Sequence, residues 1–265
     1  MKTSDFYSTI EKIAPPKLAE VWDNSGIQLD FGNPEVNRVL VAMEVTDKVI
    51  DEAIAKNADM LLVHHPLIFI PVKKFLPEDH VANYIIRLIR EGIPVYSAHT
   101  TFDSAVGGNN DYLLEKLGCR DIDRIEAAGR SENDPPIVKL GVTDEGLKLS
   151  DFCAKLKTVL GSASCIKVTG DPERVIRKVA LCTGGGGEFW EDACRAGADL
   201  FISGDIRHHE AQGAKERGMC LIDAGHWGTE NLFVPNMCEK LKKAAPGDLE
   251  VIPSEENLDP YNLIF

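Results

Sequence analysis

Three short motifs in the chain combine imidazole side chains with carboxylates. They are the adjacent pair His64 and His65 in LLVHHPLIF, the pair His99 and Asp103 in SAHTTFD, and the pair His226 and Glu230 in DAGHWGTE. Each motif follows an apolar run that is typical of a buried strand. Imidazole and carboxylate together suit zinc, iron or manganese, and a carboxylate can bridge two ions. The motifs therefore predict a metal site if the three strand ends converge.

The adjacent histidines set a condition on the backbone. Neighbouring side chains of a regular strand point to opposite faces, so His64 and His65 can converge only where the chain leaves the strand. Pro66 follows directly and favours such a departure. The alternative is a pair of hydrogen-bonded loop histidines with no metal.

The third motif has helical spacing. His226 and Glu230 are four residues apart, so both lie on one face if a helix begins at Gly225 or Trp227. In that case they form a compact two-ligand unit. The alternative is an ordinary polar pair at a helix start.

Further candidates lie in the segment ISGDIRHHEAQ, which carries His208, His209 and Glu210 just after a strand. In a metal-site cleft they would serve as proton donors or phosphate contacts. The alternative is that they are solvated residues at the start of a helix. Asp205 occupies the position equivalent to His65 in the repeat described below, which allows a direct ligand role without indicating one.

A glycine-rich run, Thr183 to Gly187, lies between a predicted strand and a predicted helix. Backbone N–H groups in such a turn can bind a phosphate. The run lacks the Lys-Ser/Thr ending of a P-loop and is not G-x-G-x-x-G, so we interpret it first as a turn and second as an anion site. His80, in a proline-flanked loop before a helix, is interpreted as a surface or capping residue.

These motifs are carried by strands that alternate with helices. We predict strands at 38–43, 60–63, 94–97, 137–142, 165–169, 178–182 and 199–202, and helices at 4–13, 47–56, 81–91, 109–117, 149–160 and 188–196. The alternation indicates the α/β class, with mostly parallel sheets covered by helices. Such sheets bind ligands beyond the carboxyl ends of their strands, where the three motifs stand.

The alternation occurs twice along the chain. Residues 36–65 align without a gap to residues 176–205 at an offset of 140, so that Val39 matches Val179 and Asp59 matches Asp199. Identities are few, and coincidence is the alternative to a true repeat. The repeat predicts two similar α/β lobes related by a pseudo-two-fold axis, with the metal site in the cleft between them.

The lobe boundary is expected at the polar, proline-bearing stretch GRSENDPP. We therefore predict a first lobe at 1–128 and a second lobe at 129–235. A C-terminal helix and tail at 236–265 are expected to pack back on the lobes.

Composition narrows the classes of partner. The 265 residues include 29 basic and 42 acidic side chains, a formal charge of -13, so nucleic acid is a poor first hypothesis. The seven cysteines are scattered without a C-x-x-C motif, which is typical of reduced thiols. The absence of a signal-peptide core and of long apolar stretches predicts a cytoplasmic protein with no membrane partner.

Together the motifs resemble one family, the dinuclear-metal-centre hexameric proteins, also called interacting-factor-3-like and known as GTP cyclohydrolase I type 2 homologs. The matching stretches are WDNSGIQLD, VTDKVIDEAI, ADMLLVHHPLIF, SAHTTFD with GGNND, SGDIRHHEAQ and DAGHWGTE, which span nearly the whole chain. One small departure is Glu44, where relatives commonly have Asp, and it bears on a contact around the site rather than on a ligand.

The resemblance implies a ligand set and an assembly. The five implied ligands of two divalent ions per subunit, whether zinc, iron or manganese, are His64, His65, Asp103, His226 and Glu230. His99 would lie close by, as a group behind the ligands or at an open position. The resemblance also implies two similar lobes with the metals between them and a ring-shaped homohexamer built as a trimer of dimers, in the short form without an inserted domain.

These observations lead to a hypothesis of a metal-dependent hydrolase acting on a small, nucleotide-like molecule. Two ions would lower the pKa of a water between them, with His99 or His208 available for proton transfer. The alternative, from a different class, is a non-catalytic metal-binding or regulatory interaction protein. A third idea, nucleic-acid binding through the hole of the ring, is weakened by the acidic charge.

Overall fold

Residues 1–76, 78–161 and 165–262 are described by a computed structural model, and they form two units. The first unit comprises Met1–Ala105 and Phe233–Leu258, and the second comprises Val106–Leu232 with residues 259–262. Both units are α/β, as predicted from the alternation of strands and helices. The division differs from the predicted ranges 1–128, 129–235 and 236–265.

The difference at the first boundary has a packing cause. Helix α5 (Asn109–Lys116) and strand β5 (Cys119–Arg124) were expected in the first lobe. In the structure Leu113 and Leu114 of α5 are buried in one core with Phe152 and Leu181 of the second unit. The chain therefore changes unit near residue 105, before the proline-bearing stretch that suggested the boundary.

The C-terminal segment has a similar explanation. Helix α10 (Phe233–Ala244) buries Phe233, Met237 and Leu241 against Phe6 in the core of the first unit. Strand β11 (Glu250–Pro253) then pairs in parallel with β2 (Arg38–Ala42). The end of the chain thus belongs to the first unit, apart from residues 259–262, and residues 263–265 of the predicted tail lie outside the described residues.

The sheet of the first unit has the strand order β1-β4-β3-β2-β11. The other strands and helices of this unit are α1 (Thr3–Ile13), η1 (Pro16–Leu18), β1 (Gly26–Leu29), α2 (Asp47–Ala55), β3 (Met60–Val63), α3 (His80–Glu91), β4 (Val95–Ser97) and α4 (Thr100–Asp103). Strands β4, β3, β2 and β11 run parallel, and β1 pairs antiparallel at the edge. This confirms the mostly parallel sheet for the first unit.

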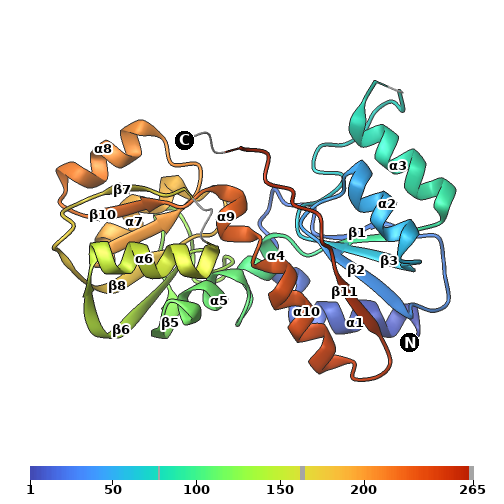
Figure 1. The fold of residues 1–265 in the computed structure, drawn as a ribbon, viewed down its shortest axis with the longest axis horizontal. Coiled ribbons are helices and arrows are strands. Elements are labelled where there is room, and N and C mark those ends of the chain that lie inside the picture. Colours follow the sequence, from blue (N-terminus) through green and yellow to red (C-terminus); the bar gives the residue numbers. More distant parts are fainter. Residues whose placement is uncertain (77, 162–164, 263–265) are drawn as a thin grey trace. The chain divides into compact units, whose positions relative to one another are not determined.

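Alternating side chains of these strands build two separate cores. Val39 and Val41 of β2 pack with α1 and α10, whereas Leu40 packs on the opposite face with α2 and α3. Figure 1 shows the two helix pairs on either side of this sheet. Continuous apolar runs such as MLLV are expected where a strand is covered on both faces.

The second unit has the strand order β5-β6-β8-β9-β10-β7. Its remaining strands and helices are β6 (Lys139–Lys148), α6 (Leu149–Leu160), β7 (Lys167–Thr169), β8 (Val175–Leu181), η2 (Gly187–Phe189), α7 (Trp190–Arg195), β9 (Leu200–Ser203), α8 (His208–Glu216), β10 (Cys220–Asp223) and α9 (His226–Glu230). Helices α5 and α6 pack on one face of the sheet, and α7 and α8 pack on the other.

A mostly parallel sheet was the wrong prediction for the second unit. Strands β8, β9 and β10 run parallel, but β6 pairs antiparallel with both β5 and β8, and β7 pairs antiparallel with β10. The burial of β6 alternates over its first five residues, and its sequence KLGVTDEGLK mixes polar with apolar residues. Such one-sided alternation is typical of antiparallel strands.

Some internal contacts recur at the offset of 140 residues that the predicted repeat uses. Asp59 Oδ2 accepts hydrogen bonds from the N–H groups of Asn37 and Arg38, at 2.8 and 2.9 Å. Asp199 Oδ2 accepts from residues 177 and 178 at 2.9 Å, the same pattern 140 positions later. Asn57 and Gly197, also 140 apart, both have positive φ. These matching contacts agree with the repeat, and the pseudo-two-fold relation of the two lobes stays a prediction.

The lengths and compositions of the helices show whether any of them could span a membrane. Over the described stretches, every helix is too short or too polar to cross a lipid bilayer. All seven cysteines lie within the described residues, and none of them forms a disulfide there.

Candidate metal centre

The adjacent histidines stand directly after β3, where the backbone leaves the strand. The N–H groups of His64 and His65 both donate to the carbonyl oxygen of Met43, at 3.0 and 2.8 Å. Two successive amides that share one acceptor cannot continue a regular ladder. The two rings consequently lie on the same side, with centroids 5.2 Å apart, and the departure predicted from Pro66 is confirmed.

A third imidazole joins this pair from the end of β4. The ring centroid of His99 lies 5.1 Å from that of His64 and 5.6 Å from that of His65. One ring nitrogen from each of the three residues lies within 4.8 Å of the others. Three imidazoles at such spacing suit a zinc ion whose fourth position is taken by water or a substrate.

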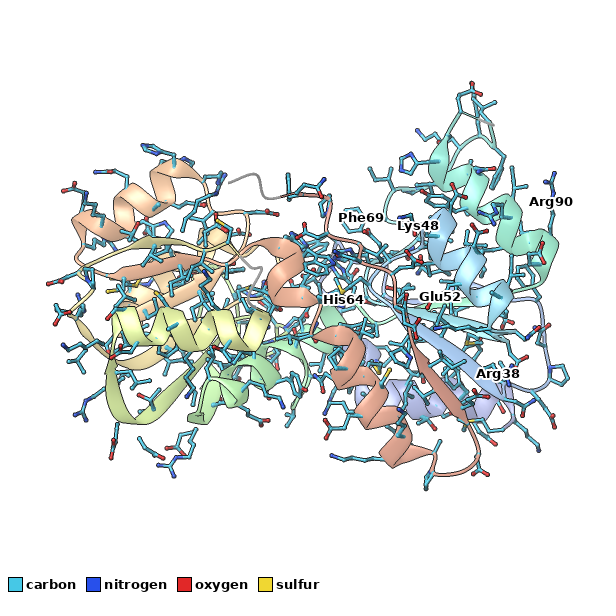
Figure 2. All side chains as sticks on the ribbon, in the orientation of Figure 1. Arg38, Lys48, Glu52, His64, Phe69 and Arg90 are labelled. Carbon is cyan, nitrogen blue, oxygen red and sulfur yellow. The ribbon has the colours of Figure 1, made fainter. Side chains whose placement is uncertain are left out.

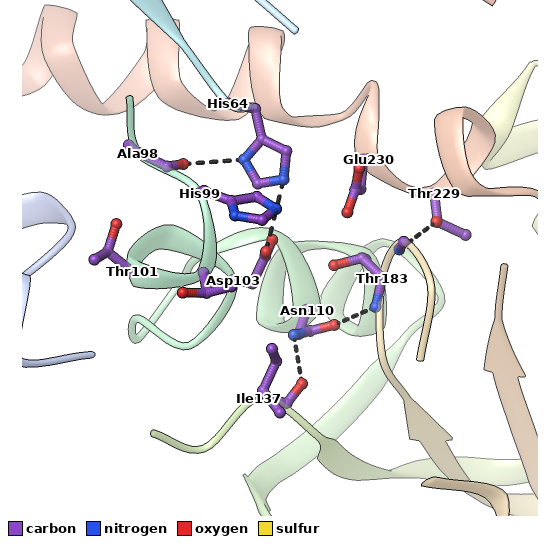
Figure 3. A network of polar contacts seen from close by, with 12 residues as sticks. His64, Ala98, His99, Thr101, Asp103, Asn110, Ile137, Thr183, Thr229 and Glu230 are labelled. Atoms are coloured by element: carbon purple, nitrogen blue, oxygen red, sulfur yellow. Dashed lines mark hydrogen bonds and ion pairs between the residues drawn. The ribbon is translucent and has the colours of Figure 1, made fainter. Parts of the chain in front are cut away.

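A buried carboxylate lies against the same group. Asp103 is the last residue of α4, and its Oδ2 is 3.6 Å from Nε2 of His64 (Figure 3). Two ligands that each lie about 2.0 to 2.2 Å from one ion are separated by roughly 3.0 to 3.5 Å. The spacing of these two side chains is therefore close to that of a pair sharing a metal ion.

Oxygen atoms behind the rings orient the imidazoles of the first unit. Nδ1 of His64 lies 3.0 Å from the carbonyl oxygen of Ala98, and Nδ1 of His65 lies 3.5 Å from Oε2 of Glu44. A partner at Nδ1 leaves Nε2 available as the metal-binding atom. Glu44 thus contacts the ring of a candidate ligand, and its role behind that ligand stays a prediction.

Asp23 completes the arrangement, and sequence reasoning gave it no role. Its buried carboxylate lies 2.8 Å from Nδ1 of His99 and accepts hydrogen bonds from Ser25 and Thr100. Burial alone would raise the pKa of Asp23, but the hydrogen bond and charge of His99, together with the hydrogen bonds from Ser25 and Thr100, outweigh burial and lower the pKa to about 2. The available signal was the motif WDNSG, whose aspartate is otherwise unexplained.

The replacement Asp23→Asn is expected to lower the stability of the fold at neutral pH more than at acid pH. Because the folded-state pKa lies below the ordinary value of 3.8, ionised Asp23 stabilises the fold above about pH 4, and this contribution disappears as the pH falls from about 4 to about 2. Urea unfolding at pH 6 and at pH 2.5 would measure the difference. The variant should be less stable than the wild type at pH 6, and a gap that persists unchanged at pH 2.5 would contradict this account.

The second unit presents its own imidazole and carboxylate. His226 begins helix α9 and Glu230 ends it, and Nε2 of His226 lies 2.9 Å from Oε2 of the almost fully buried Glu230. Nδ1 of His226 lies 2.7 Å from Oδ2 of Asp205. The helical spacing predicted for this pair is confirmed, and Asp205 orients the imidazole from behind.

The glycine-rich run passes directly beside this carboxylate. Gly184 has a φ of +69°, and a Cβ there would overlap Oε1 of Glu230 and lie 3.3 Å from Nε2 of His226. Only glycine therefore allows the backbone to approach the pair so closely.

Hydrogen bonds hold the same run in place. The N–H of Thr183 donates to Oδ1 of the buried Asn110 at 2.8 Å, and Nδ2 of Asn110 donates to the carbonyl oxygen of Ile137 at 2.9 Å (Figure 3). The N–H groups of Gly184 and Gly186 donate to hydroxyl groups at 2.9 Å. With these three amides engaged, the run supports the interpretation as a structured turn more than that of an anion site.

The remaining candidates lie at the starts of helices α3 and α8. His208 and His209 are exposed at the first turn of α8, and over the described residues the side chain of His208 makes no hydrogen bond or ion pair. Glu210 is buried and forms a capping box with Arg207, whose N–H donates to it at 2.7 Å. His80 is the exposed first residue of α3, as expected.

Comparison with known proteins supports the resemblance noted in the sequence. The chain matches the family model described as Duf34/NIF3 (NGG1p interacting factor 3) over residues 1–260. It is 34% identical over 264 residues to a Clostridium perfringens protein named GTP cyclohydrolase 1 type 2 homolog, with 100% of both chains covered. It is 32% identical over 273 residues to the Schizosaccharomyces pombe protein NIF3 homolog, which covers 97% of this chain and 96% of that relative.

Solved structures agree with this assignment. A Staphylococcus aureus protein superposes with a TM-score of 0.89 at 25% identity, covering 100% of this chain and 99% of the other. A Bacillus cereus protein described as related to NIF3 has a TM-score of 0.90 at 22% identity, with the same coverage, and shows the shared fold. Because the family model spans nearly the whole chain and relatives above 30% identity match it end to end, the chain belongs to the DUF34/NIF3 family.

Proposed function

We propose that this protein binds a pair of divalent metal ions through His64, His65, Asp103, His226 and Glu230 and hydrolyses a small, nucleotide-like substrate. The observation that carries the proposal is the shared orientation of the imidazoles. Each of the three histidines in this set has an oxygen near Nδ1, which leaves Nε2 to bind a metal. In each unit one of these Nε2 atoms also faces a buried carboxylate, at 3.6 Å in the first and 2.9 Å in the second.

Covalent connection supports a single centre made from both sets of ligands. The ring of Phe233 packs on the ring of His64, with centroids 4.9 Å apart. Glu230 precedes Phe233 by three residues, a length of chain that spans at most roughly 11 Å. A side chain tethered so closely to His64 is well suited to serve as a ligand in common with it.

The chain contributes groups that suit hydrolytic chemistry. Bound divalent ions would acidify a water molecule and polarise the bond to be broken. His99 would then take part in proton transfer, since Asp23 engages its Nδ1 and its ring centroid lies 5.1 Å from that of His64 and 5.6 Å from that of His65. His208, the other predicted proton donor, is exposed on α8 and has less support for this role.

The substrate class rests on the resemblance and on the printed names of relatives. The Clostridium perfringens relative is called a GTP cyclohydrolase 1 type 2 homolog, and opening a purine ring by water is a reaction that a two-metal site can accelerate. Protein loaded with Zn²⁺, Mn²⁺ or Fe²⁺ should therefore release product from GTP or another purine nucleotide, measured by chromatography. Equal rates for the wild type and for His64→Ala would refute the assignment.

The replacement His99→Gln separates proton transfer from metal binding. We expect the variant to retain its metal while the hydrolysis rate falls by roughly 100- to 10,000-fold, the usual contribution of a general acid or base. Metal content by atomic spectroscopy and rate should be measured on the same sample. Parallel loss of both would identify His99 as a ligand, and His80→Ala, at an exposed helix start, serves as the control.

The non-catalytic alternative makes a different prediction. A metal-binding interaction protein would retain its ions tightly without turning over any nucleotide, and it would form a stable complex with another protein. We also propose that the chain forms a homohexamer, a trimer of dimers, as the family resemblance implies. We propose a location in the cytoplasm, which is supported by seven cysteines without a disulfide. Sedimentation velocity should then show a species with six times the mass of the chain, and a smaller species would contradict the hexamer.

A further inference from the structure

Two aromatic rings of the first unit are exposed beside its histidines. Trp22 is 58% exposed and Phe69 is 51% exposed, and their ring centroids lie 6.0 Å apart at an interplanar angle of 68°. The centroid of His99 lies 5.9 Å from that of Trp22 and 6.3 Å from that of Phe69. Figure 2 shows Phe69 on the side of the unit that carries His64, away from Arg38 and Arg90.

Hydrogen bonds hold the two segments that carry these rings together. Nδ2 of Asn24 donates to the carbonyl oxygen of Ile68 at 2.7 Å, and the N–H of Ile68 donates to Oε1 of Gln28 at 3.0 Å. Nε2 of Gln28 in turn donates to the carbonyl oxygen of Asn24 at 2.6 Å. The exposed rings are thus presented by a braced backbone, which lowers the entropy lost when a ligand binds.

Residues close to Trp22 in the sequence contact His99 of the candidate centre. Asp23, next to Trp22, contacts Nδ1 of His99, and the hydroxyl of Ser25 accepts a hydrogen bond from the N–H of His99 at 3.2 Å. Any molecule that covers Trp22 and Phe69 therefore lies close to the imidazole of His99, whose centroid is 5.9 Å from that of Trp22 and 6.3 Å from that of Phe69. A small ligand in this position would have its ring beside the reacting groups.

The negative net charge of the chain favours recognition of the ligand through a planar ring rather than through anionic groups. The chain carries a formal charge of -13, so its overall field does not attract an anionic nucleotide. Binding free energy must then come from the metals and from apolar contact with the base. Aromatic side chains provide such contact with any planar base, because every base has a π face.

We propose that Trp22 and Phe69 form the surface that holds the planar ring of the substrate against the histidines. This inference rests on the proposed function, since it names the part of a nucleotide-like substrate that the chain recognises. Loss of one stacking side chain usually weakens binding by roughly 5- to 150-fold.

Isothermal titration of metal-loaded protein with GTP, and with inorganic tripolyphosphate as a probe without a ring, tests the proposal. Trp22→Ala and Phe69→Ala should each weaken GTP binding by roughly 5- to 150-fold while the affinity for tripolyphosphate and the metal content stay unchanged. Trp22→Phe should recover most of the GTP affinity. Phe75→Ala is the matched control, because Phe75 is 55% exposed in the same unit, and it should bind as the wild type does.

Several results would overturn the inference. They are the absence of GTP binding by the wild type, equal GTP affinity in Trp22→Ala, and an equal loss of tripolyphosphate affinity. A changed sedimentation coefficient of Trp22→Ala would instead assign the rings to contact with a second copy of the chain. The failure of the proposed function is distinguishable, since GTP bound through Trp22 without product would refute hydrolysis and leave this inference standing.

Discussion

Glu230→Ala is expected to remove tightly bound metal from the protein. Glu230 is almost fully buried, and its carboxylate faces Nε2 of His226. Loss even of a residue behind a ligand typically weakens metal affinity 10- to 100-fold, so loss of a ligand should cost at least roughly 100-fold. Metal per chain after extensive dialysis, measured by atomic spectroscopy, should fall from about two ions to less than one.

The thermal stability of Glu230→Ala should also show the loss of bound metal. A ligand present at 100 times its dissociation constant stabilises the folded state by about 2.7 kcal/mol, and a 100-fold weaker site loses most of that stabilisation. The rise in melting temperature on adding Zn²⁺ or Mn²⁺ should therefore largely disappear in Glu230→Ala. Glu216→Ala, at an exposed position at the end of α8, is the control and should respond as the wild type does. An unchanged metal content in Glu230→Ala would remove Glu230 from the ligand set.

Gly184→Ala is expected to lower both the free energy of unfolding and the metal affinity. The backbone at Gly184 has a φ of +69°, and the added Cβ would overlap the carboxylate of Glu230. The left-handed conformation alone costs a non-glycine residue roughly 1 to 2 kcal/mol. The overlap adds roughly 1 to 3 kcal/mol of overpacking or displaces Glu230 from its position.

A matched variant separates the two causes. Gly218 lies in the same unit with a φ of +68°, and a Cβ there meets nothing within 4 Å. Gly218→Ala should therefore lose only roughly 1 to 2 kcal/mol of the free energy of unfolding and keep its metal. Gly184→Ala should lose more stability and also bind metal more weakly. Equal stability and equal metal content in the two variants would show that the close approach to Glu230 has no consequence.

The sequence anticipated the local part of the candidate centre well. Apolar runs followed by His-x-x-x-carboxylate spacing predicted where strands end and side chains with metal-binding chemistry begin. Pro66 predicted that the chain turns after β3, which brings His64 and His65 to one side. These features depend on a few neighbouring residues, so patterns of type and spacing are sufficient to recognise them.

Features that depend on distant residues were missed or misplaced. Asp23 lies 76 positions before His99, and the spacing of the two does not indicate that one orients the other. The carbonyl oxygen of Ala98, which lies near Nδ1 of His64, carries no side-chain signal at all. The boundary between the units was placed by a proline-bearing loop, whereas the packing of α5 on β6 and β8 decides it.

The sequence by itself predicted the α/β class, the histidines and carboxylates that could hold a metal, and a short internal repeat, because each prediction follows from residue type and short-range periodicity. Tertiary structure alone decided which oxygen orients each imidazole, why Gly184 must be glycine, and which unit receives α10 and β11. The physical reason is that these outcomes depend on packing and hydrogen bonds between residues far apart in sequence. A contact of that kind exists only after the backbone has folded.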